Sequence, residues 1–182
     1  MLESSDPARY YEQIVPQQLA AALEHAPANV ADQPELTATY EITGPGGGTF
    51  GLRVHGKAIE FVPGGIQGSD MWTTMTIDNW RANIASDGGD PVIDYVLRRK
   101  VAIVKSLRGT VRLHLTRSDG STFESATVFG AQAEPVVTIH MTAADYAAMM
   151  RGELNGQMAF LTGKLKFEGS LPLLMQLSAL AG

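Results

Sequence analysis

The four histidines, His25, His55, His114 and His140, are the first residues to consider for catalysis or metal binding. None lies in a His-x-x-x-His or His-Glu-x-x-His pattern, the spacing that places two zinc ligands on one helical turn. His114 and His140 each fall in a predicted strand, and pairing of those strands would bring them together as a metal or acid–base pair. No third ligand is evident, so two solvated histidines are the favoured interpretation. We therefore assign no catalytic residue and no metal ligand.

Charge and composition exclude several classes of function. The net charge is −5, which disfavours a nucleic-acid partner, and no block of about five or more like charges offsets it. The chain has no cysteine, which excludes disulfides, thiolate metal ligands and cysteine nucleophiles. Its polar start does not resemble a signal peptide, and no apolar run approaches the roughly 20 residues of a membrane helix. We expect a cytoplasmic protein without a cofactor, in contact with membranes at most transiently.

Periodicity and turn signals predict an α+β fold, with helices covering a mostly antiparallel sheet. The predicted helices span residues 7–26, 78–84, 90–97, 142–150 and the stretch after Ser170. The predicted strands span residues 36–42, 49–55, 57–62, 71–77, 110–116, 122–129, 135–141 and 165–167. Residues 87–91 are predicted to break the chain. Residues 98–107 fit either a helix or a strand.

The two halves of the chain share the order of several short motifs. The matching pairs are 37–43 with 110–116, 49–50 with 122–123, 75–80 with 141–146, 100–103 with 164–167, and 106–107 with 170–171. The fourth match would make residues 100–104 a strand. We interpret the pattern as a duplication, with a divergent first repeat at 1–108 and a second at 109–182.

The end of the chain carries the most specific motif. Residues 159–169 read Ala-Phe-Leu-Thr-Gly-Lys-Leu-Lys-Phe-Glu-Gly, between a strand at 137–142 and a leucine-rich amphipathic helix. This order resembles the sterol carrier protein type 2 family, from about residue 92 or 110 to residue 182. The resemblance implies a curved sheet covered by helices and an apolar tunnel that the terminal helix closes. It implies a sterol, a fatty acid or a fatty acyl-CoA as ligand.

The resemblance also implies which side chains bind the ligand. The nine residues are Met149, Met150, Phe160, Leu161, Phe167, Leu171, Leu174, Met175 and Leu177. Five of the eight methionines lie at or after Met141, and flexible methionine side chains suit an adaptable apolar pocket. For any single methionine, ordinary core packing is the favoured interpretation, and only the cluster together with the family resemblance favours a pocket.

Three functions fit these features. The first is a carrier that binds, presents or transfers an apolar, lipid-like molecule without catalysis. The second is an enzyme that uses the same pocket, with His114, His140 or Asp145 as base. The third is an accessory module whose last helix packs on a partner or forms a homo-oligomer. The basic residues within 98–108 would suit a CoA phosphate or an anionic membrane, but a solvated face is the favoured interpretation. We favour the carrier.

Overall fold

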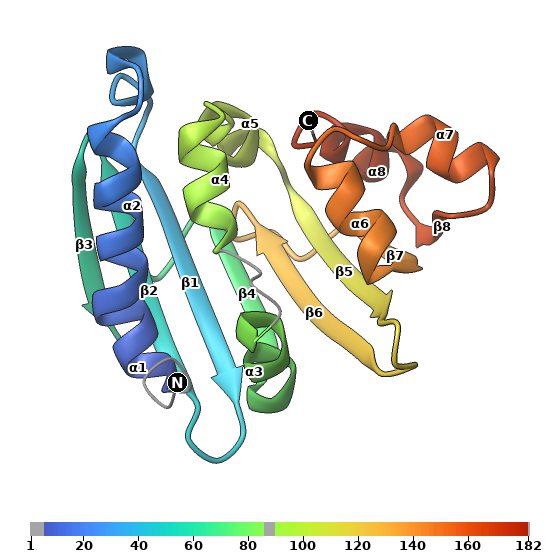
Figure 1. Ribbon diagram of the computed structural model, residues 1–182, viewed down its shortest axis with the longest axis horizontal. Helices are drawn as coiled ribbons and strands as arrows, with labels where there is room; N and C mark the ends of the chain where they lie inside the picture. Colours follow the sequence, from blue (N-terminus) through green and yellow to red (C-terminus); the bar gives the residue numbers. More distant parts are fainter. Residues whose placement is uncertain (1–5, 86–89, 182) are drawn as a thin grey trace.

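The computed structural model describes residues 6–85 and 90–181. A single open sheet of eight strands runs through the molecule in the order β3-β2-β1-β4-β6-β5-β7-β8. The helices lie over one face of this sheet (Figure 1). The parallel pairs are β1–β4 and β5–β7, and the other five pairs are antiparallel. The predicted α+β class, with a mostly antiparallel sheet under helices, is confirmed.

The strands agree with the sequence pattern to within two residues at each end. They are β1 (Leu36–Thr43), β2 (Gly48–His55), β3 (Ala58–Pro63), β4 (Met71–Thr76), β5 (Gly109–Thr116), β6 (Thr122–Phe129), β7 (Val136–Thr142) and β8 (Lys166–Gly169). Successive side chains of a strand point to opposite faces of the sheet. Leu36 and Tyr40 of β1 are therefore buried under the helices, whereas Glu41 lies on the opposite face and accepts a hydrogen bond from Trp72 Nε1 at 3.0 Å.

The first helical segment is continuous but not uniform. It comprises α1 (Pro7–Arg9), the π-helical turn η1 (Tyr10–Ile14) and α2 (Val15–Glu24). Asp6 caps its start, since Asp6 Oδ1 accepts a hydrogen bond from Ala8 N–H at 3.0 Å. The π turn precedes Pro16, which has no N–H to donate and whose ring needs space in the preceding turn. The wider turn lets the neighbouring residues Tyr10 and Tyr11 both be buried.

The central helices resolve the ambiguity at residues 98–107. They are η2 (Ala28–Val30), α3 (Ile77–Ala85), α4 (Pro91–Leu97) and α5 (Val101–Ser106). Most of the ambiguous stretch is helical, because α5 covers residues 101–106. Arg99, whose φ is 58°, separates α5 from α4. The predicted match of 100–103 with 164–167 is therefore wrong, because it aligns part of a helix with part of a strand. Residues 86–89, which include most of the break predicted at 87–91, lie outside the described residues.

Polar side chains cap the last three helices, α6 (Ala143–Met150), α7 (Gly156–Leu161) and α8 (Leu171–Leu177). Thr142 Oγ1 accepts from Asp145 N–H at 3.0 Å, and Ser170 Oγ accepts from Leu173 N–H at 3.2 Å. These two helices start where the sequence predicts. The sequence did not predict α7, which Asn155 caps through two backbone N–H groups.

The two halves share a strand topology. In the first half, the hairpin β1–β2 is followed by the extra strand β3, then by β4, which lies parallel to β1, and then by α3. In the second half, the hairpin β5–β6 is followed by β7, parallel to β5, and then by α6. The sheet order 2-1-4 thus recurs as 6-5-7, and the β4–β6 pair joins the two units. This topology agrees with a duplication, and its boundary at residue 108 stays a prediction.

Aromatic side chains fill the space under the helices of the first half. Tyr11 stacks on Tyr40 and Phe50, with ring centroids 4.5 and 5.4 Å apart. Trp80 Nε1 donates a hydrogen bond to the Tyr11 hydroxyl at 3.1 Å, and all four residues are buried. Large aromatic rings give dense packing here. The corresponding space in the second half is hollow.

Candidate ligand-binding pocket

A cavity of about 610 Å³ lies between the second half of the sheet and helices α4, α6, α7 and α8. Its floor is the helix-covered face of β5, β6 and β7, where Val111, Leu113, Phe129 and Ile139 line it. Leu113 and Ile139 are register partners in the parallel pair β5–β7, so both point to the same face. Small-molecule sites in proteins commonly have volumes of about 300–1,000 Å³, and this cavity falls in that range.

Helix α6 forms one wall of the pocket. Tyr146, Met149 and Met150 recur at helical spacing, so they share the face that lines the cavity. None of the residues of α6 is fully buried. The apolar face of α6 thus borders open space rather than packed core.

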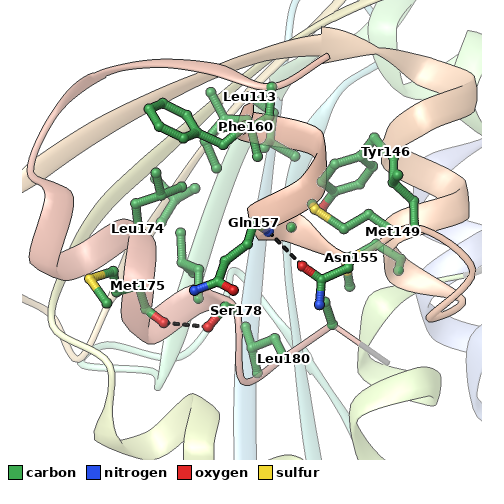
Figure 2. Close-up of a pocket in the computed structure, with 18 of the residues that line it drawn as sticks. Leu113, Tyr146, Met149, Asn155, Gln157, Phe160, Leu174, Met175, Ser178 and Leu180 are labelled. Carbon is green, nitrogen blue, oxygen red and sulfur yellow. Dashed lines mark hydrogen bonds between the residues drawn. The ribbon is translucent and has the colours of Figure 1, made fainter. Parts of the chain in front are cut away.

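Helix α8 forms the opposite wall and is fixed at both ends. Figure 2 shows Leu174 and Met175 of α8 across the cavity from Tyr146 and Met149. At its start, Ser170 N–H donates to Val136 O at 2.9 Å, and the buried Leu173 lies against Gly109 of β5. Gly109 has a φ of 125°, and a side chain there would collide with the Pro135 carbonyl and press on Leu173. Beyond α8, Lys100 Nζ donates to Ala179 O at 2.9 Å.

Large apolar side chains are exposed at the opening of the pocket. Those most exposed in the described chain all lie on α7 and α8: Met158, Phe160, Leu161, Leu171 and Met175. Phe160, Leu171 and Met175 also line the cavity, so the exposed surface is continuous with its walls. We call these five residues the mouth patch. Apolar groups gathered on one surface usually mark an interaction site.

Comparison with known proteins identifies this half of the chain. Residues 95–182 match the SCP-2 sterol transfer family. The resemblance predicted from the sequence is thus confirmed for these residues, which we call the SCP-2-like half. They include the end of α4 from Tyr95 onward, the whole of α5 and every residue that lines the pocket. A search of curated proteins found no match.

Solved structures of sterol carrier proteins cover about half of this chain. The sterol carrier protein domain 2 of Helicoverpa armigera is 21% identical, with a TM-score of 0.39 over 49% of this chain and 79% of that one. The Sterol Carrier Protein 2 Like 2 of Aedes aegypti is 20% identical, with a TM-score of 0.35 over 48% and 94%. The apo form of Sterol Carrier Protein 2 from Yarrowia lipolytica is 21% identical, with a TM-score of 0.33 over 45% and 76%.

The SCP-2-like half places most of the predicted binding residues on the pocket wall. Seven of the nine line the cavity: Met149, Met150, Phe160, Leu171, Leu174, Met175 and Leu177. Leu161 is 76% exposed and does not line it. Phe167 is not in the lining either, and its ring packs on Phe160 with centroids 5.7 Å apart. A role of any of these residues in ligand binding stays a prediction.

The sequence reasoning did not assign the sheet floor or Tyr95 of α4 to the pocket. The strict alternation of residues 110–116 was the available signal, because it places Val111 and Leu113 on one face of a strand. Nothing comparable pointed to Tyr95, since the position of α4 over the sheet depends on packing with the first half.

The histidine pair lies on the far side of the sheet from the pocket. His114 and His140 are register partners with ring centroids 5.1 Å apart, as strand pairing suggested. His114 Nδ1 lies 3.0 Å from Glu124, and His140 Nε2 lies 3.9 Å from Glu168. Neither histidine lines the cavity. Within residues 6–85 and 90–181, no cluster of three or more potential ligands for a metal ion occurs.

Asp145, considered above as a base, and the basic residues within 98–108 form contacts outside the cavity. Asp145 Oδ1 accepts from Lys164 Nζ at 3.0 Å, and this contact holds the pKa of Asp145 below its usual value. In the basic stretch, Lys105 pairs with Asp70 at 3.0 Å, and the Arg98 guanidinium donates to Met150 O. None of these charged groups lines the pocket. Of the helices described here, none is long and apolar enough to cross a membrane.

Proposed function

We propose that the SCP-2-like half binds one apolar, lipid-like molecule in the pocket and that the protein carries or presents it without catalysis. The observation that carries this proposal is the 610 Å³ cavity, whose walls are mostly Leu, Met, Phe, Val and Ile side chains. The match of the same residues to a family described as sterol transfer supports it. The cytoplasmic location expected from the sequence is part of the proposal.

The energetics favour an apolar occupant. Burying roughly 300 Å² of apolar ligand surface contributes about 7 kcal/mol, from which the cost of association must be subtracted. Met149, Met150 and Met175 supply flexible walls that can adjust to the shape of the ligand. Sterols, fatty acids and fatty acyl-CoA are the ligand classes implied by the family resemblance.

We expect Nile red, a neutral apolar dye, to bind the full chain at one site and to gain fluorescence there. A sterol or a long-chain lipid should displace it. Fluorescence titration at several protein concentrations gives the stoichiometry and the competition. If the dye does not bind, or if it binds and none of the lipids displaces it, a lipid-binding role for the pocket is excluded.

The mouth patch supports a second part of the proposal, namely brief contact with a membrane during uptake and release. Three of its five side chains line the cavity and are exposed, so they offer an apolar surface that is continuous with the pocket. Apolar residues that insert at the headgroup boundary gain free energy in proportion to the area they bury. A small patch of this kind gives weak, reversible binding.

Leu161→Glu tests membrane contact separately from ligand binding, because Leu161 is exposed and lies outside the cavity. We expect transfer of a fluorescent lipid between phosphatidylcholine vesicles to slow by about 5- to 10-fold, while affinity for Nile red stays unchanged. A stopped-flow transfer assay measures the rate. An unchanged transfer rate would contradict the role of the patch, and loss of a dimer in the variant would assign the patch to a second copy instead.

A further inference from the structure

The described side chains on the pocket wall carry no charge. Among the lining residues within 6–85 and 90–181 there is no Asp, Glu, Lys, Arg or His. The polar side chains there are Tyr95, Thr127, Tyr146, Asn155, Gln157 and Ser178. A ligand with one polar group must therefore be recognised through hydrogen bonds alone.

Three of these side chains already have partners within the protein. Thr127 Oγ1 forms a hydrogen bond with Thr73 Oγ1 at 2.8 Å, and Ser178 Oγ donates to Met175 O at 2.6 Å. Asn155 Oδ1 caps α7. Gln157 is exposed, and its amide reaches across the opening of the pocket (Figure 2). Once these four side chains are set aside, Tyr95 and Tyr146 are the remaining polar side chains of the described wall.

Tyr95 of α4 and Tyr146 of α6 approach each other from two helices. No hydrogen bond joins either hydroxyl to another group in the part of the chain that the structure describes. Burial raises the pKa of Tyr146 to about 12, and burial, followed by the proximity of Tyr146, raises that of Tyr95. Both phenols therefore stay neutral at physiological pH. Each can donate one hydrogen bond and accept another.

Arg98 and Lys100 bind near the pocket but do not offer it a positive charge from its wall. The Arg98 guanidinium donates to Met150 O, and Lys100 Nζ donates to Ala179 O at 2.9 Å. Both cations bind backbone carbonyls of residues that flank or line the pocket, and neither lines it. A carboxylate drawn into the cavity would lose its hydration without gaining a counter-ion, which is strongly unfavourable. A hydroxyl or carbonyl group has a far smaller hydration to lose.

We propose that the pocket selects a lipid whose polar group is an uncharged hydroxyl or carbonyl, and that Tyr95 and Tyr146 form hydrogen bonds with that group. This inference rests on the proposed function and narrows its ligand class. Free fatty acid anions are disfavoured, and neutral amphipathic lipids are favoured. The two tyrosines determine specificity for the headgroup, whereas the apolar walls supply most of the affinity.

The test compares two probes that differ only in the headgroup, 1-dodecanol and dodecanoate, as competitors of Nile red at pH 8. The alcohol should displace the dye at a concentration at least about 10-fold lower than the carboxylate does. In Tyr146→Phe, the affinity for the alcohol should fall by about 2- to 10-fold, the value of one neutral hydrogen bond. Affinity for dodecanoate should fall less, so the preference for the alcohol should shrink, once each competitor is corrected for the affinity of the variant for Nile red.

Tyr10→Phe is the matched control, because Tyr10 is a buried tyrosine of the first half that does not line the pocket. It should leave all three affinities unchanged. Dodecanoate binding as tightly as dodecanol, or Tyr146→Phe weakening both equally, would overturn the inference and leave the proposed function standing. Failure of Nile red itself to bind would instead overturn the proposed function.

Discussion

Leu174→Glu is expected to weaken binding of an apolar ligand by at least about 100-fold, which corresponds to roughly 3 kcal/mol. Leu174 lines the pocket from α8, opposite Tyr146. Ligand entry would bury the new carboxylate against apolar walls that offer no counter-ion. Because Leu174 is only partly buried in the empty protein, the carboxylate can face water there and the fold should survive. Nile red titration and thermal unfolding measure the two effects.

Leu161→Glu is the control for this prediction. It adds the same charge to the same surface region, but Leu161 does not line the cavity. It should bind Nile red as the unchanged protein does. If Leu174→Glu instead retains ligand and changes the oligomeric state, measured by light scattering on a sizing column, α8 is an assembly surface and the carrier account is wrong.

Asp90→Asn should make stability less dependent on pH. Asp90 is buried at the start of α4, where it accepts hydrogen bonds from Tyr40 Oη at 2.6 Å and Val92 N–H at 3.0 Å. Burial raises its pKa from 3.8 to about 6, although both hydrogen bonds oppose this shift. The folded state therefore binds the proton more tightly than the unfolded state. The stabilisation of the folded state by protonated Asp90 is complete below about pH 4 and is lost as the pH rises through about 6.

The full loss corresponds to about 3 kcal/mol, since one pKa unit equals about 1.4 kcal/mol. An asparagine keeps the cap without the charge. The free energy of unfolding of Asp90→Asn, relative to the unchanged protein, should rise by about 2 kcal/mol between pH 4.5 and pH 8. Urea unfolding at both pH values measures it. Asp32→Asn, at an exposed position, is the control, and parallel pH profiles for all three proteins would contradict the prediction.

Asp90 also connects helix α4, which borders the pocket, to the aromatic core around β1. Through Tyr40 it ties the start of α4 to the aromatic core of the first half, and Tyr95 of the same helix lines the pocket. The first half thus has a structural role in the site even though aromatic rings fill its own interior. We expect variants that remove the Tyr40–Asp90 hydrogen bond to shift Tyr95 in the pocket wall, although neither residue lines the pocket.

The strands and helix starts were predictable because each depends on local chemistry. The alternation of residues 110–116 is a pattern between neighbouring positions. Each cap at Asp6, Thr142 or Ser170 is a hydrogen bond to a residue two or three positions away. Residues 98–107 were ambiguous because their apolar spacing suits a helix and the repeat suggested a strand. The backbone at Arg99, which ends α4 with a positive φ, is not visible in that pattern.

The pocket was only partly predictable, because its shape depends on tertiary packing. Family resemblance led to α6 and α8, but α7 has only six residues and no periodicity long enough to recognise. Leu161 and Phe160 are adjacent in sequence, and only the orientation of α7 shows that Phe160 lines the cavity and Leu161 does not. The sequence could not show that aromatic rings fill the first half, because Tyr11 and Trp80, which meet there, lie 69 positions apart.

Native mass spectrometry of the full chain, purified without detergent and measured before and after organic extraction, tests the central claim most directly. The account predicts one bound molecule of a few hundred daltons per chain, removable by extraction, and absent or much reduced in Leu174→Glu. A clean apo mass that stays unchanged after incubation with 1-dodecanol, a sterol, a fatty acid and an acyl-CoA would contradict it.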